Sequence, residues 1–123
     1  MPWSALGAVF AAIGVLVGAF GAHALRGRLD AYGTGIYERA VFYQFVHALG
    51  LLAVGVARDA GALGAASANL AGALFVIGIL VFSGSLYALA LTGIRRLGAI
   101  TPLGGLAFVA GWIAFATGLI LVR

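Results

Sequence analysis

The stretch AVFYQFVHALGLLAVGVA, residues 40–57, contains no charged side chain and is bounded by Arg39 and Arg58. The chain holds three more uncharged stretches, residues 1–25, 60–94 and 97–122. A helix that crosses the hydrocarbon of a bilayer needs about 20 mainly apolar residues, a length that the three exceed and that 40–57 nearly reaches. In lipid, only helices and closed barrels give every backbone N–H and C=O group a hydrogen-bond partner. The stretches do not alternate strictly between apolar and polar residues, which excludes a barrel. The sequence therefore predicts an all-α membrane protein, a four-transmembrane-helix bundle running up-down-up-down.

The composition supports this class and excludes several others. Hydrophobic residues make up 64% of the chain and charged residues 8%, against about a quarter charged in soluble domains. The net charge of +4 comes from seven Arg with no Lys, without a basic cluster of the kind that nucleic-acid binding uses. Anionic lipid headgroups are the expected partner, and nucleic acid is not. With no cysteine, disulfides, thiolate metal sites and thiol catalysis are excluded.

We expect a single domain over residues 1–123, because the chain is too short for a second bundle. Local signals then set the limits of the helices. Thr34 is the expected N-cap of the second helix, Ser67 or Asn69 that of the third, and Pro102 is tolerated in the first turn of the fourth. The predicted spans are residues 3–25, 36–57, 67–92 and 100–122.

The connections and the first span carry further expectations. Residues 26–39 contain three glycines and four large apolar or aromatic side chains, which indicates turns and a segment lying on the membrane surface. Trp3 is expected at the membrane interface. The first span is expected to be retained rather than cleaved, because no Lys or Arg precedes it and it exceeds the apolar core of a signal peptide.

The arginines predict an orientation. Five of them lie in the first and third connections, at Arg26, Arg28, Arg39, Arg95 and Arg96. The opposite face holds Arg58 and Arg123. Because cytoplasmic loops are enriched in Lys and Arg, we expect the first and third connections in the cytoplasm and both termini outside.

Glycines recur every seven residues in the first and fourth spans, at Gly7, Gly14 and Gly21 and at Gly104, Gly111 and Gly118. Gly14 also begins a small-xxx-small motif that ends at Gly18. A seven-residue repeat keeps one stripe facing a neighbour, and small residues let helix backbones approach in lipid. We therefore expect the first and fourth helices to pack centrally, with a dimer interface as the alternative use of a stripe.

Tyr43, Gln44 and His47 are polar residues inside the second span. Their spacing lets all three share one helix face, and an ionisable side chain within a span is a functional-site hypothesis. Such a face could hold a proton, a cation, a quinone oxygen or a haem iron. The competing interpretation is that His47 is neutral and bonds a Gln or Tyr across helices, as a polar link between them.

Three other polar residues complete the hypothetical ligand or proton site. His23 lies near the end of the first span, where a residue at headgroup level is the simpler interpretation. Ser83 and Tyr87 stand four apart in the third span, and hydroxyls there commonly bond backbone or a neighbouring helix. We expect no metal and no haem or other cofactor, since the ligand set is too small. We expect no hydrolase either, because the three acids all lie outside the spans.

Several strings together resemble one family. They are Gly18 to Leu25, Tyr43-Gln44-x-x-His47-Ala48-Leu49, Phe82 to Tyr87, Ala90 to Gly93, Ile100 to Gly105, and Gly111-Trp112. In this order they resemble the small bacterial membrane proteins grouped as domain of unknown function number 423, with relatives among eukaryotic transmembrane protein 256. The resemblance covers nearly the whole chain. It implies a multi-pass protein of the inner, or plasma, membrane and carries over no catalytic residue.

Two functional hypotheses remain from the sequence. The first is a non-enzymatic bundle that binds a lipid-phase ligand or a partner membrane protein, which could be a second copy of the chain. The second is a small transporter or channel with a polar path at Tyr43, Gln44 and His47. An enzyme is the least favoured class, because acids are few and outside the spans.

Overall fold

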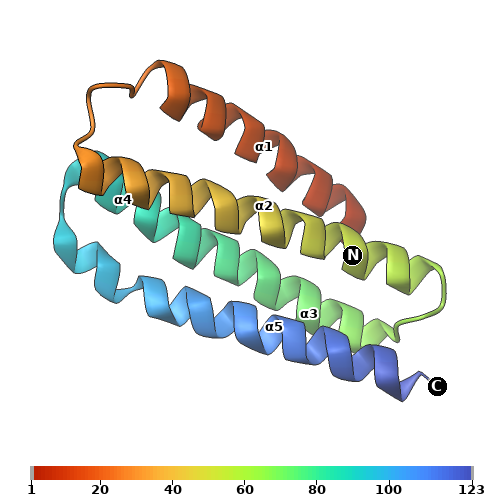
Figure 1. Ribbon diagram of the computed structural model, residues 1–123. Coiled ribbons are helices and arrows are strands. Elements are labelled where there is room, and N and C mark those ends of the chain that lie inside the picture. Colours follow the sequence, from red (N-terminus) through yellow and green to blue (C-terminus); the bar gives the residue numbers. More distant parts are fainter. Residues whose placement is uncertain (1, 123) are drawn as a thin grey trace.

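A computed structural model describes residues 2–122 as four long helices joined by short connections (Figure 1). All four are long and apolar enough to cross a membrane, which confirms the predicted all-α class. The elements in chain order are α1 (Trp3–His23), α2 (Ala31–Asp59), α3 (Ala65–Gly78), the π-helical turn η1 (Ile79–Ser83), α4 (Gly84–Thr92), the 3-10 turn η2 (Arg95–Ala99) and α5 (Thr101–Leu121). α3, η1 and α4 form one continuous helix from Ala65 to Thr92.

α2 begins five residues before the predicted start. Its N-cap is Asp30, whose side chain accepts a hydrogen bond from the Gly33 backbone N–H at 2.7 Å. Thr34 is therefore not the cap, because Asp30 satisfies a backbone donor one turn earlier and the helix is already formed when it reaches Thr34. The first connection consequently shrinks from the predicted 26–39 to residues 24–30.

The third long helix also departs from the predicted start. It begins at Ala65 after Gly64, with no side-chain cap, so neither Ser67 nor Asn69 caps it. It ends where Gly93 takes a left-handed conformation, φ +71°, and bonds its N–H to the Leu89 carbonyl at 2.8 Å. Glycine is the usual residue at such a helix end because it carries no Cβ.

The helices lie in chain order, from α1 along one edge of the molecule to α5 along the other (Figure 1). α1 packs against α2, α5 packs against α3 and η1, and α2 packs against α3, η1 and α4. The expectation that the first and fourth helices are central is therefore wrong. A glycine stripe fixes which face of a helix is approached closely, but a helix at the edge of the bundle needs such a face as much as a central one does.

The glycine stripes themselves face neighbouring helices. A Cβ at Gly7 would lie 2.6 Å from the Ala48 carbonyl oxygen and 2.7 Å from the Leu52 nitrogen, both backbone atoms of α2. At Gly18 the nearest atom would be a Val41 methyl group at 3.5 Å, an ordinary contact. The other stripe glycines also face side chains or backbone of the adjacent helix, at Gly14, Gly21, Gly104, Gly111 and Gly118. These positions are points of close helix approach.

Trp3, the first residue of α1, is buried against the rest of the protein. Its ring packs on Gly72 of α3, and its indole N–H donates to Asn69 Oδ1 at 3.1 Å. The start of α1 is thus attached to α3, across the end of α2.

Candidate functional site

The length of α2 relates its polar residues to the membrane. At 1.5 Å per residue its 29 residues extend about 44 Å, whereas the hydrocarbon is about 30 Å thick. The uncharged residues 40–57 account for about 27 Å and fit that thickness. Arg39 then marks the boundary of the hydrocarbon, and Tyr43 lies one helical turn inside it.

One group of polar residues joins α1, α2 and α4, and we call it the α1–α2–α4 cluster: Tyr37, Gln44, Ser83 and Tyr87. The Tyr87 hydroxyl donates to Gln44 Oε1 at 2.7 Å, and Gln44 Nε2 donates to the Phe10 carbonyl of α1 at 2.9 Å. Gln44 is 3% exposed, so its amide is an internal link between three helices and is not directed at lipid.

The remaining members of this cluster bond to backbone. The Ser83 hydroxyl, fully buried in the π-helical turn, donates to the Ala40 carbonyl at 2.7 Å. The Tyr37 hydroxyl donates to the Val17 carbonyl of α1, and the Tyr37 and Tyr87 rings meet edge to face with centroids 5.3 Å apart. A backbone carbonyl within a helix already accepts one hydrogen bond and has a second lone pair, which accepts the bond from the side chain. The polar atoms of the cluster are therefore hydrogen-bonded within the protein.

His47 forms a second group with Trp112 of α5. The Trp112 indole N–H, which can only donate, lies 3.0 Å from His47 Nε2. Nε2 must therefore accept, and the ring proton sits on Nδ1, which donates to the Tyr43 carbonyl at 2.8 Å. Both ring nitrogens are occupied and the imidazole is neutral. A metal or haem iron could bind Nε2 only by displacing Trp112.

Aromatic rings enclose His47 on the remaining sides. Its ring stacks on Phe108 with centroids 3.5 Å apart and planes 9° from parallel, and Phe75 meets it edge-on at 5.5 Å. The side chain is 3% exposed. This packing makes His47 a structural link between α2, α3 and α5.

The six predicted site residues do not converge on one pocket. Gln44, Ser83 and Tyr87 belong to the α1–α2–α4 cluster, whereas Tyr43 and His47 lie toward α5. The prediction that Gln44 shares a face with Tyr43 and His47 is wrong, because one residue turns the helix by 100° and directs Gln44 toward α1 and α4. His23 is the exposed last residue of α1 and takes part in neither group.

A groove runs along the surface between α2 and α5, and we call it the α2–α5 groove. Within the membrane its wall holds Tyr43, Phe82, Phe108, Val109 and Trp112. Toward the connections it is lined by Tyr32, Ile36, Arg39 and Thr101. Phe82 and Pro102 line both hollows, so the two adjoin and together extend from Arg39 to Trp112.

Tyr43 differs from Gln44, His47, Ser83 and Tyr87, whose side chains are all hydrogen-bonded. Its hydroxyl forms no hydrogen bond with residues 2–122, and no buried side-chain nitrogen or oxygen in that range lacks a partner. The hydroxyl is therefore at the surface of the groove. Its ring is held in place by Phe82, with centroids 4.4 Å apart. The membrane part of the groove thus presents one unbonded hydroxyl on an aromatic wall.

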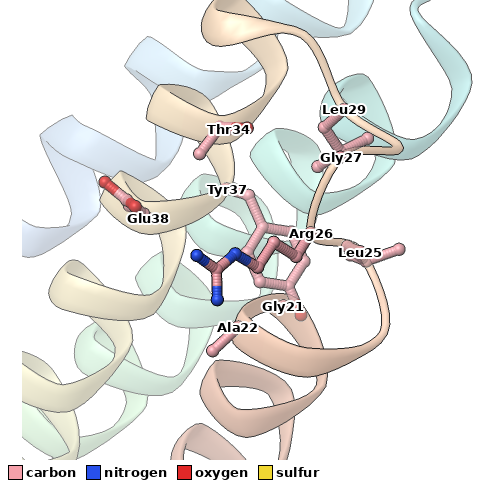
Figure 2. Close-up of a pocket in the computed structure, with 9 residues that line it drawn as sticks. All are labelled: Gly21, Ala22, Leu25, Arg26, Gly27, Leu29, Thr34, Tyr37 and Glu38. Atoms are coloured by element: carbon pink, nitrogen blue, oxygen red, sulfur yellow. The ribbon is translucent and has the colours of Figure 1, made fainter.

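A smaller hollow lies between the end of α1 and the start of α2 (Figure 2). Figure 2 shows Arg26 from the connection and Glu38 from α2 around it, with Tyr37 and Gly21 between the two helices. Arg26 and Glu38 carry opposite charges, so this hollow has no net preference for an anion. The α2–α5 groove, in contrast, carries a cation and no acid among its lining residues.

Fold and site together define a small integral membrane protein with four transmembrane helices and an internal network of polar links. Residues 17–105 match the family described as "Protein of unknown function (DUF423)". The chain is 50% identical over 108 residues to a UPF0382 membrane protein of Staphylococcus haemolyticus, covering 88% of this chain and 86% of that one. It is 47% identical to the UPF0382 membrane protein YwdK of Bacillus subtilis, covering 88% and 87%. The chain belongs to this DUF423, or UPF0382, family of bacterial membrane proteins, as the resemblance predicted. No solved structure matches it.

Two residues of the site are not predicted from the sequence. Trp112 belongs to the family motif Gly111-Trp112, but only the structure shows that it bonds His47 and lines the groove. The sequence predicts Tyr37 in a surface segment, whereas it is buried and bonds α1. An aromatic residue with a polar atom in or beside a span is the signal that could have found both, since such atoms need a partner.

Proposed function

We propose that the protein is a non-enzymatic membrane bundle that binds a lipid-phase molecule in the α2–α5 groove. The observation that carries this proposal is the Tyr43 hydroxyl, which lacks a partner in residues 2–122 while His47 and the α1–α2–α4 cluster are fully bonded. A polar group in hydrocarbon is costly without a hydrogen bond. A ligand with an acceptor atom at this depth offsets that cost.

The lining of the groove supports the same proposal. Ligand sites are mostly apolar and aromatic, with a few polar groups that fix orientation, and the groove has this composition. The alternative of a transport path along Tyr43, Gln44 and His47 has less support. Gln44 and His47 each bond to protein partners on different neighbouring helices, so the three side chains line no common route within residues 2–122.

Val109→Trp is expected to prevent a lipid-phase molecule from binding in the groove. Val109 is 56% exposed on its wall, so the larger ring fills the space without entering the core. Val15→Trp is the matched control, because Val15 is 60% exposed on α1, away from the groove. After extraction into lipid nanodiscs without detergent, native mass spectrometry should find a bound apolar molecule on the wild type and on Val15→Trp, and none on Val109→Trp.

Three outcomes would count against this proposal. One is a wild-type protein with no bound molecule, and another is equal retention by Val109→Trp and Val15→Trp. The third is a second copy of the chain, or another membrane protein, held across the groove; the site would then be a protein interface.

We further propose that the protein lies in the bacterial inner membrane with its first and third connections in the cytoplasm. The five arginines near these connections support this orientation. Because the chain has no cysteine, single cysteines can report it. A membrane-impermeant maleimide applied to intact cells should label Ala62→Cys, and should label Ala24→Cys only after lysis. The reverse pattern would invert the topology.

A further inference from the structure

We infer that the molecule in the α2–α5 groove is a glycerophospholipid with an anionic headgroup, bound with its phosphate at Arg39 and an ester carbonyl at the Tyr43 hydroxyl. This inference rests on the proposed function and names the class of ligand. Its basis is the juxtaposition of a cation, an unbonded hydroxyl and an apolar groove in that order along α2.

The order of these groups matches the order of groups in such a lipid. Arg39 lines the end of the groove nearest the connections, Tyr43 follows, and Phe108, Val109 and Trp112 line the deeper part. A glycerophospholipid presents phosphate, then ester carbonyls, then acyl chains. An acyl chain can therefore lie against the aromatic wall while the polar groups remain at the two polar residues.

The spacing also fits. Arg39 and Tyr43 are four residues apart, about 6 Å along the helix axis. The headgroup and interfacial layer on each side of a bilayer is about 5–7 Å thick. A phosphate at the boundary and an ester carbonyl at its inner edge thus coincide with the two side chains. Long helical side chains lean toward the N-terminus of their helix, which moves both toward the boundary.

The charges near the groove favour an anionic headgroup over a zwitterionic one. Arg95 also lies at this end, with its guanidinium 4.2 Å from the centroid of the Tyr32 ring that lines the groove. The two acids of this region are engaged elsewhere. Asp30 caps α2 and lies with Arg28 and Arg95 in a neighbouring hollow, and Glu38 lines the separate hollow with Arg26 (Figure 2). The positive charge at the groove is therefore not neutralised by a lining carboxylate.

Trp112 provides a direct readout of occupancy. It is 40% exposed and lines the groove, whereas Trp3, the other tryptophan, is 6% exposed and attached to α3. The protein is placed in phosphatidylcholine nanodiscs with increasing mole fractions of phosphatidylglycerol that carries brominated acyl chains, which quench indole fluorescence on contact. Wild-type quenching should saturate at a much lower mole fraction than with brominated phosphatidylcholine.

Arg39→Gln should raise the half-saturating mole fraction of phosphatidylglycerol at least about 10-fold, as expected for loss of a charge-assisted hydrogen bond. Arg96→Gln is the matched control: it removes the same charge from the same end, but Arg96 does not line the groove. An arginine that acts only through the positive potential of the protein surface should, when removed, raise the half-saturating mole fraction about 5-fold at most.

Tyr43→Phe keeps the ring that packs on Phe82 and removes the hydroxyl alone. It should raise the half-saturating mole fraction about 2- to 10-fold, the range of a neutral hydrogen bond. Brominated phosphatidylglycerol with ether linkages lacks the ester carbonyl, so it should bind the wild type more weakly by a similar factor. The Tyr43→Phe variant should not distinguish ester from ether lipid.

The inference is overturned if phosphatidylcholine quenches the wild type as effectively as phosphatidylglycerol, or if Arg96→Gln has the same effect as Arg39→Gln. Discrimination of ester from ether lipid by Tyr43→Phe would overturn the assignment of Tyr43. If the Val109→Trp comparison yields a bound molecule that is not a phospholipid, this inference fails and the proposed function stands. If the wild-type groove holds no bound molecule, both this inference and the proposed function are wrong.

Discussion

His47→Ala is expected to lower the free energy of unfolding by about 3 kcal/mol. The substitution removes a ring stacked 3.5 Å from Phe108 and leaves a cavity beside Phe75, and truncation of a buried aromatic side chain typically costs about 3–5 kcal/mol. It also leaves the Trp112 N–H without its acceptor. Reversible unfolding in mixed micelles, followed by circular dichroism, measures the change.

A double-mutant cycle separates the ring from the hydrogen bond. Trp112→Phe removes the N–H and should cost about 0.6 kcal/mol for the bond, the average for such links in membranes, plus lost packing. The effects of His47→Ala and Trp112→Phe should be less than additive, because they share this contact. A His47→Ala variant as stable as the wild type, yet altered in ligand binding or ion flux, would show that His47 has a direct functional role.

Gly7→Ala is expected to cost about 1–3 kcal/mol, the usual effect of overpacking. The added methyl group would meet backbone atoms of α2 at 2.6 and 2.7 Å, and a backbone cannot rotate away as a side chain can. α1 must therefore move off α2. The same unfolding measurement applies, and proteolysis of the loosened α1 should accelerate in parallel.

Gly18→Ala is the control on the same helix. Its methyl group would stand 3.5 Å from Val41, and alanine favours helix over glycine by about 1 kcal/mol. The variant should be as stable as the wild type or slightly more stable. Equal losses for Gly7→Ala and Gly18→Ala would mean that α1 is held by general contact rather than by close approach at Gly7.

The spacing of charges was sufficient to predict the four helices, because a charged side chain is costly inside the hydrocarbon and so marks its limits. The positions of the helix ends were harder to predict, because neighbouring residues can each cap a helix and the sequence does not show which one does. Asp30 and Thr34 are both good caps, and the one whose side chain reaches a free N–H sets the start of α2. The order of the helices could not be read from glycine stripes, which identify a close-packed face without naming the neighbour.

The candidate site was predictable in part for a related reason. Polar residues in apolar spans are conspicuous, so Tyr43, Gln44 and His47 were found from sequence. Their roles depend on partners 34 to 65 residues away in the chain, such as Phe10 for Gln44 and Trp112 for His47. No periodicity within one helix contains that information. The structure therefore separates Tyr43, the residue with a free hydroxyl, from neighbours that are already bonded.

The attachment of Trp3 to α3 has a consequence for biogenesis. Trp3 is synthesised before its partners Asn69 and Gly72, which leave the ribosome more than sixty residues later. The α1–α2 hairpin can enter the membrane as a unit, because the α1 glycines all face residues of α2. The start of α1 remains without its Asn69 contact until the third long helix inserts beside it. The burial of Trp3 thus reports on a step of assembly that follows insertion of the third long helix.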